Sequence, residues 1–147
     1  MGQPKQFEDL EVWQAARDLA TGVSRLSRDG SLAKDYGFRD QLQGSALAVM
    51  AAIADGHEQS DSRELLHSLH VAKGLAAKVR CLVHVAKDLG YLSDQQRSGL
   101  MDQLTSVSRQ LGGFIRYLEK GPAPAAAPPK ADFANEGPPA PRRMGGR

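Results

Sequence analysis

Residues 61–90 read DSRELLHSLHVAKGLAAKVRCLVHVAKDLG, and their periodicity is that of one long helix. At about 100° per residue the apolar side chains gather on one side, as in a helix that buries a single stripe. They are Leu69, Ala72, Leu75, Ala76, Val79, Leu82, Val83, Ala86 and Leu89. Asp61 or Ser62 is placed to cap the helix, with Glu64 completing a capping box behind Asp61, and Gly90 is placed to end it.

The opposite side of this predicted helix carries basic side chains and no acidic one. Six of them follow one another at steps of three, four or seven residues, which places them in one row along the helix axis. The row consists of Arg63, His70, Lys73, Arg80, His84 and Lys87. It would run roughly 36 Å at 1.5 Å per residue, long enough to lie along several phosphates of a nucleic acid. Lys78 in the same stretch, and Arg109 and Arg116 further along the chain, extend this predicted binding surface.

Two interpretations of the row stay open. A solvated helix face usually mixes signs, because like charges one turn apart repel each other by a few tenths of a kcal/mol. Binding to a phosphate backbone, which releases counterions, explains why such repulsion is tolerated here. The sequence shows no recognition-helix motif and no exposed aromatic platform beside the row. The expected contacts are therefore to the backbone of RNA or DNA rather than to bases.

Two helical patterns precede this stretch. In the first pattern, Asp9 is an N-cap candidate. Trp13 falls among its apolar positions, so we expect Trp13 in the core or in a subunit interface rather than stacked on nucleic-acid bases. A loop is predicted through Tyr36 and Gly37. The second helix, over residues 38–56, is rich in glycine, alanine and serine, which let a neighbouring backbone approach closely. We expect it to be the central, most enclosed helix.

A fourth helical pattern is opened by a capping box of Ser93 and Gln96. Four helices with short connections and no strand candidate predict an all-α fold, an antiparallel up-down four-helix bundle over residues 7–120. Residues 121–147 are rich in Pro, Ala and Gly and cannot bury enough apolar surface to order themselves. We predict a disordered tail there, whose arginines either help to hold RNA or acidic partners or belong to a solubilising appendage.

Composition and charge narrow the function classes. The chain has 147 residues, 41% of them hydrophobic and 24% charged, as expected for one soluble globular domain. Residues 1–120 carry fifteen basic and fifteen acidic side chains, so the predicted basic patch is local rather than a general field. The single cysteine, Cys81, excludes an internal disulfide and fits a reducing cytoplasm. We see no targeting signal and no membrane-length apolar run, and expect a cytoplasmic protein.

Other chemistry finds little support. Glu64 and His67 have the Glu-x-x-His spacing of ferritin-like ligands, with His70 one turn further on, but that chemistry needs a second copy of the motif and two more carboxylates. Cys81 with Arg80 and His84 nearby could hold a reactive thiol, although an inert, half-buried cysteine is far commoner. No phosphate loop and no nucleophile constellation can be assembled. We expect no catalytic residue, no metal, no cofactor and no enzymatic activity.

Several separated motifs resemble the bacterial four-helix-bundle family named for proteins encoded in 23S ribosomal RNA intervening sequences. The similar segments are FEDLEVWQ at 7–14, Gln41, AIADG at 52–56, Ser62, Glu64, AKG at 72–74 and LGYLS at 89–93. The resemblance covers residues 7–119 and keeps the order of the motifs. This chain departs from the family pattern at Ala52, where the family usually has Asn, and at Lys78 and Arg80, where it commonly has acids.

The second half of the chain is similar to a sister branch, the accessory variability determinant of diversity-generating retroelements. The segments that carry this likeness are AKVRCL at 77–82 and SRQLGGFI at 108–115. The resemblance implies a pentameric barrel that binds nucleic acid and works beside a reverse transcriptase. We therefore expect a non-enzymatic, oligomeric accessory protein, with a structural or protein-interaction bundle that has no nucleic-acid role as the alternative.

Overall fold

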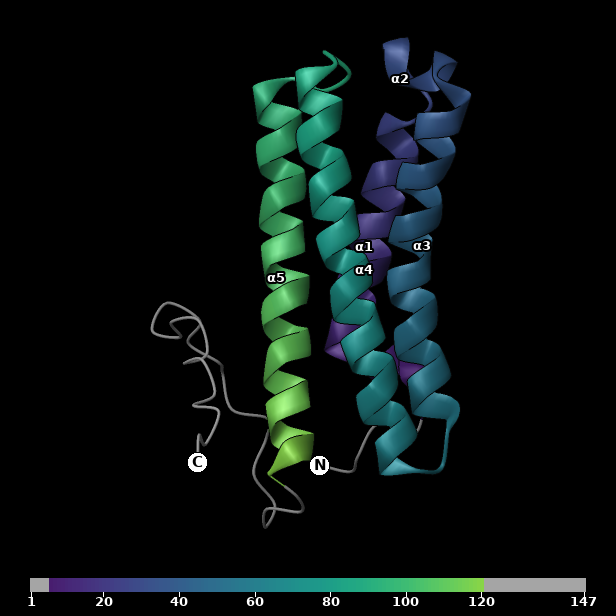
Figure 1. The fold of residues 1–147 in the computed structure, drawn as a ribbon, viewed down its shortest axis with the longest axis vertical. Helices are drawn as coiled ribbons and strands as arrows, with labels where there is room; N and C mark the ends of the chain where they lie inside the picture. Colours follow the sequence, from purple (N-terminus) through teal and green to yellow (C-terminus); the bar gives the residue numbers. More distant parts are fainter. Residues whose placement is uncertain (1–5, 121–147) are drawn as a thin grey trace, which may run out of the picture.

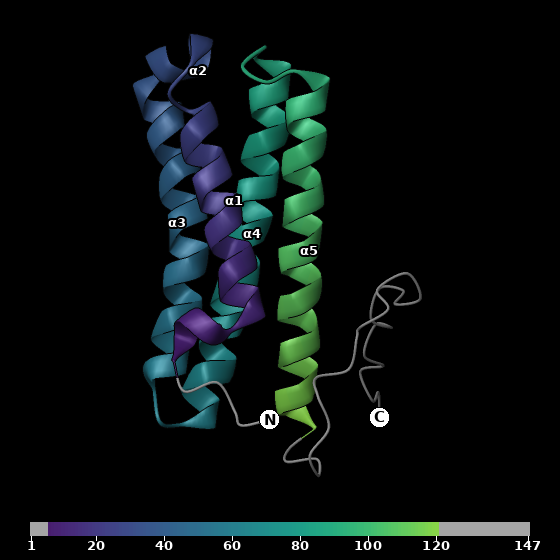
Figure 2. The ribbon, with the colours of Figure 1, turned by 180° about the vertical axis from the view of Figure 1, so that it is seen from behind.

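The computed structural model describes residues 6–120, which form four long helices, one short helix and one 3-10 turn (Figures 1 and 2). In chain order these are η1 (Phe7–Asp9), α1 (Glu11–Leu26), α2 (Gly30–Lys34), α3 (Tyr36–Glu58), α4 (Ser62–Asp88) and α5 (Asp94–Glu119). The long helices run side by side in alternating directions, which confirms the predicted antiparallel bundle. The predicted tail, residues 121–147, lies outside the described residues.

Each long helix buries a stripe of apolar side chains against two neighbours. α1 packs against α3 and α5, and α4 packs against the same two helices. The largest fully buried side chains are Leu19, Val23, Leu32, Leu42, Val49, Ile53, Leu69, Val79, Val83, Leu104, Val107 and Leu111. Trp13 is only 8% exposed and belongs to this core, as predicted.

The helix ends agree with the sequence in part. Ser93 and Gln96 form the predicted capping box, with bonds of 3.0 and 2.9 Å between side chain and backbone. Gly90 ends α4 with a φ of 77°, in the left-handed region that favours glycine. Asp61 caps α4 by accepting a backbone N–H bond, but the reciprocal bond from Glu64 does not form, so the second predicted box is wrong.

Two helix starts differ from the prediction. Asp9 does not cap α1, because it lies inside η1 and α1 begins after Leu10 with no side-chain cap. The predicted loop before α3 contains α2, which is anchored by the fully buried Leu32. α3 then begins at Tyr36, because Asp35 caps it by accepting a backbone N–H bond.

α3 contacts α1, α2, α4 and η1, but its small residues do not all face these neighbours, since Gly44 and Ala51 are exposed. Among the glycines of α3, the one with a close neighbour is Gly56, where an added Cβ would lie 2.6 Å from the Cβ of Ser68 on α4. Gly56 is therefore needed for its small size rather than for a turn. The helix continues through it to Glu58 instead of stopping there.

A polar contact ties the α4–α5 connection to the start of α3. The Tyr91 hydroxyl donates a 2.6 Å hydrogen bond to the Asp35 carboxylate, and the Tyr91 ring packs edge-on against Phe38. The hydrogen bond from Tyr91, together with one from the Phe38 N–H, lowers the pKa of Asp35. The same bond to Asp35 raises the pKa of Tyr91. This pair locks one end of the bundle.

Candidate nucleic-acid interface

The predicted basic row lies on the side of α4 that faces α5. Its members are exposed, apart from Lys87, which is partly buried. Lys87 Nζ lies 3.2 Å from Asp94 Oδ1 and His70 Nε2 lies 3.6 Å from Glu119 Oε1, and both acids belong to α5. The row therefore borders the buried stripe of α4 on the side toward α5. The prediction that the row lies opposite the buried stripe was wrong.

These two contacts also set the register between the antiparallel helices α4 and α5. At this register Arg109, which is exposed on α5, lies level with the part of α4 between Lys73 and Arg80. Among residues 6–120, neither Lys73 nor Arg80 nor Arg109 takes part in an ion pair. We call Lys73, Arg80, His84 and Arg109 the basic face.

The other predicted binding residues are distributed around this face. Arg63 lies in the first turn of α4, and His70 and Lys87 lie beside the two acids of α5. Arg116, on α5, is partly buried. Lys78 is exposed on the other flank of α4, where it borders α3, so the structure separates it from the row.

Sequence reasoning missed Asp94 and Glu119 as members of this surface. A helix shows in its own sequence which charges it carries, but acids that a neighbouring helix brings to it depend on the packing register. In the sequence, Asp94 is only one of the two residues between Ser93 and Gln96, which form the predicted capping box of α5. The basic row of α4 contains no acid, yet the folded chain places an acid of α5 near each end of the row.

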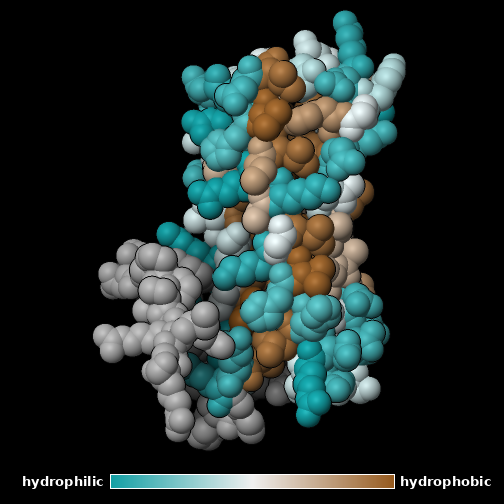
Figure 3. Space-filling model, in the orientation of Figure 1, coloured by the Kyte–Doolittle hydropathy of each residue, from teal (hydrophilic) through white to brown (hydrophobic). Residues whose placement is uncertain are grey.

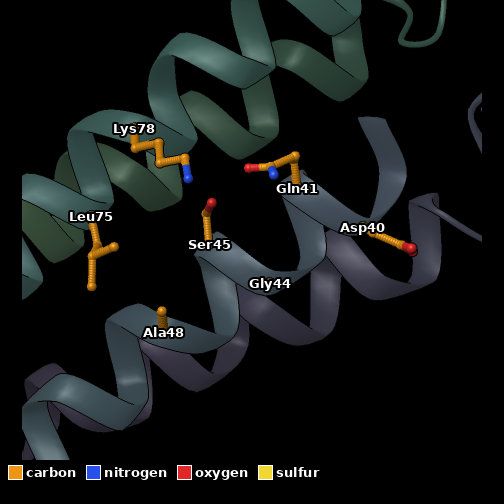
Figure 4. Close-up of a pocket in the computed structure, with 7 residues that line it drawn as sticks. All are labelled: Asp40, Gln41, Gly44, Ser45, Ala48, Leu75 and Lys78. Carbon is orange, nitrogen blue, oxygen red and sulfur yellow. The ribbon is translucent and has the colours of Figure 1, made fainter. Parts of the chain in front are cut away.

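A second surface feature lies between α3 and α4, a shallow groove of about 280 Å³. It is lined by Asp40, Gln41, Gly44, Ser45 and Ala48 of α3 and by Leu75 and Lys78 of α4. Figure 4 shows the Lys78 ammonium directed into the groove toward Gln41 and Ser45. Figure 3 shows a broken apolar band between polar patches on this side of the molecule.

The alternative chemistries gain no support from the geometry. Glu64, His67 and His70 are all exposed, and the described part of the chain contains no group of three or more side chains placed to hold a metal ion. Cys81 is exposed on α4 rather than half-buried as predicted. None of the helices in residues 6–120 is long and apolar enough to span a membrane.

Comparison with known proteins finds a solved structure of similar fold and a matching family. The crystal structure of a protein of unknown function from the S23 ribosomal protein family of Bacteroides thetaiotaomicron superposes with a TM-score of 0.67, over 71% of this chain and 95% of that one. The two sequences are 14% identical, so this likeness concerns the fold alone. No curated protein matches the chain. The family model described as 23S rRNA-intervening sequence protein matches residues 8–113, most of the helical bundle, and the chain therefore belongs to that family.

Proposed function

We propose that this protein binds RNA or DNA through the phosphate backbone, using the basic face of α4 and α5. One observation carries the proposal: Lys73, Arg80 and Arg109 come from two neighbouring helices, lie within about two helical turns of one another along the bundle and have no ion-pair partner among residues 6–120. Exposed basic side chains that have no ion-pair partner and stand on a rigid surface are suited to neutralising phosphates, which releases condensed counterions.

The composition of the surroundings favours backbone contacts over base contacts. The exposed residues of α5 near the basic face include the small polar side chains of Ser98, Thr105 and Ser106 and one acid, Asp102. Within the described chain, the one aromatic side chain that is largely exposed is Tyr36, which lies at the start of α3 under the Arg39 guanidinium. Without an aromatic platform the surface cannot stack unpaired bases, so sequence preference should be weak.

The acids of α5 divide the row into stronger and weaker positions. Asp94 and Glu119 compete with phosphate for Lys87 and His70. The middle of the row, where no acid is in contact, supplies most of the binding in this proposal. A reverse transcriptase as partner protein and a pentamer as the assembly extend the proposal by resemblance to the accessory variability determinant branch.

The direct test replaces Lys73, Arg80 and Arg109 together by Ala and measures affinity for fluorescently labelled RNA and DNA. We expect a large loss on both, with no change in the ranking of different sequences. The matched control removes the same charge by replacing three other exposed basic residues by Ala. They are Arg25 of α1, Arg28 in the turn that follows it and Lys34 of α2. Equal affinities for wild type and both triple variants would contradict the proposal and favour the alternative, a structural or protein-interaction bundle with no nucleic-acid role.

A further inference from the structure

The sequence after α5 differs from the bundle in composition and charge. Residues 1–120 balance fifteen basic against fifteen acidic side chains, so the net charge of +2 comes entirely from residues 121–147. Residues 137–147 carry three arginines and no acid, and they follow a segment rich in Pro and Ala. We call Arg142, Arg143 and Arg147 the arginine cluster. The cluster lies outside the described residues, so its relation to the bundle depends on where α5 ends.

α5 ends beside the basic row of α4. Its last residue is Glu119, whose Oε1 lies 3.6 Å from Nε2 of His70, and Lys120 is the C-cap. Lys73 follows His70 by three residues along α4, which is roughly 4.5 Å at 1.5 Å per residue. Figure 1 shows that α5 ends at the same end of the bundle at which α4 begins. The chain therefore leaves the bundle next to one end of the basic face.

The length of chain between α5 and the arginine cluster is sufficient to reach the whole basic row. At the 3.1 Å per residue of an extended proline-rich chain, residues 121–141 can span roughly 65 Å. The row runs roughly 36 Å along α4, from Arg63 to Lys87. The cluster can therefore meet a ligand that lies anywhere along the basic face, and also the part of a long ligand that extends beyond it.

Charge indicates what the arginine cluster binds. Like charges repel, so the basic face itself is not a binding site for the cluster. A duplex carries one negative charge per roughly 1.7 Å, which gives about 20 charges along the ~36 Å of the row. The basic face has only four side chains, so a nucleic acid bound there keeps many phosphates without a protein partner. Guanidinium groups bind phosphates bidentately and stay charged at every physiological pH.

We propose that the arginine cluster is a second phosphate-binding contact, which holds the same nucleic-acid molecule that the basic face binds. This inference rests on the proposed function, because the basic face brings the ligand to the end of α5. Residues 121–141 link the two contacts, so the second binding event is intramolecular and raises the affinity. Contacts to phosphates carry no sequence information, so the cluster raises the affinity for all sequences alike.

The test replaces Arg142, Arg143 and Arg147 together by Ala in the full chain and titrates labelled RNA and DNA duplexes at several salt concentrations. We expect about a tenfold loss of affinity at ~0.1 M salt. The slope of log affinity against log salt should fall by up to about 2.7, which is roughly 0.9 for each phosphate contact. Replacing the same three residues by Lys keeps their charge and should keep the slope. Helical circular dichroism should be unchanged in both variants.

A matched control shows whether position matters as well as charge. The variant with Arg25, Arg28 and Lys34 changed to Ala removes the same charge from the bundle, and should keep the affinity and slope of wild type. Changing the arginine cluster and the basic-face residues Lys73, Arg80 and Arg109 together should lower the slope by about 5.4. The two losses add because both sets of side chains contact one molecule. A cluster that bound a separate molecule would leave the slope at the basic face unchanged.

The outcomes separate this inference from the proposed function. A cluster variant with wild-type affinity and slope, beside a basic-face variant that binds weakly, would overturn the second contact alone and favour an acidic partner protein as the ligand of the cluster. A loss in the Arg25, Arg28 and Lys34 control as large as that in the cluster variant would also overturn it, because net charge alone would explain both. A loss in the cluster variant with none in the basic-face variant would overturn the proposed function and the joint contact with it.

Discussion

Single residues on α4 differ in how available they are to a ligand. Lys73 and Arg80 have no ion-pair partner in the described chain, whereas Lys87 Nζ lies 3.2 Å from the Asp94 carboxylate. All three were equal members of the row in the sequence. The difference arises from α5, whose first residue is Asp94.

This difference predicts an order of effects. Lys87→Ala should weaken nucleic-acid binding less than Lys73→Ala, because Lys87 is already partly neutralised. Asp94→Asn should strengthen binding, since it frees Lys87 for a phosphate. Titration of the three variants on one labelled duplex at a single salt concentration measures this. Weaker binding by Asp94→Asn would show that the carboxylate does not compete.

The hydrogen bond between Tyr91 and Asp35 predicts a pH-dependent stability. The pKa of Asp35 lies below its ordinary value of 3.8 in the folded chain, so its contribution is present above that pH and is lost as pH falls through the lowered pKa. The pKa of Tyr91 lies above 10.0, so its contribution is present below that pH and is lost as pH rises through the raised pKa. Tyr91→Phe removes the bond and should lower the stability.

Denaturant unfolding of wild type and Tyr91→Phe between pH 3 and 8 measures this contribution. We expect a constant difference in unfolding free energy from about pH 5 to pH 8 that shrinks toward pH 3. A difference that is the same at pH 3 and pH 7 would show that the bond does not depend on the charge of Asp35.

At the level of helices, the sequence predicted the four long elements because each has a strong apolar period. The boundaries of α4 and α5 follow from their caps, and both were predicted to within one or two residues at Asp61, Gly90 and Ser93. α2 was missed, since five residues are too few to show a period, and its fold depends on burial of Leu32.

Small residues in α3 show where sequence reasoning stops. Composition indicates that another backbone comes close, but it cannot say which one. At Gly56 the close neighbour is α4 of the same chain, whereas at Gly44 nothing in the protomer approaches. Only the packing register distinguishes the two glycines.

Gly56 and Gly99 should respond in opposite directions to the same substitution. Gly56→Ala places a Cβ 2.6 Å from the Cβ of Ser68 and should destabilise the bundle by about 1–3 kcal/mol, the usual effect of overpacking. Gly99→Ala meets nothing within 4 Å and should stabilise it by about 0.5–1 kcal/mol, because Ala favours a helix. Urea unfolding of both variants measures the two changes. A stabilising Gly56→Ala would show that α3 and α4 are further apart than described.

In the whole molecule, α4 separates two surfaces. Its flank toward α5 carries the basic face, and its flank toward α3 carries Leu75 and Lys78, which line the groove, while the stripe between the two flanks is buried. The sequence predicted the basic residues and the bundle. It did not assign Lys78 to the flank toward α3, because one helix read alone gives no position for its neighbours.

The most direct test of nucleic-acid binding is the salt dependence of affinity. Each phosphate contact contributes roughly 0.9 to the slope of log affinity against log salt on a duplex. Wild type should therefore show a steep slope, and the variant with Lys73, Arg80 and Arg109 changed to Ala should lose about 2.7 from it. Equal slopes for the two proteins would contradict phosphate binding by the basic face and would show that the row is only a solvated helix face.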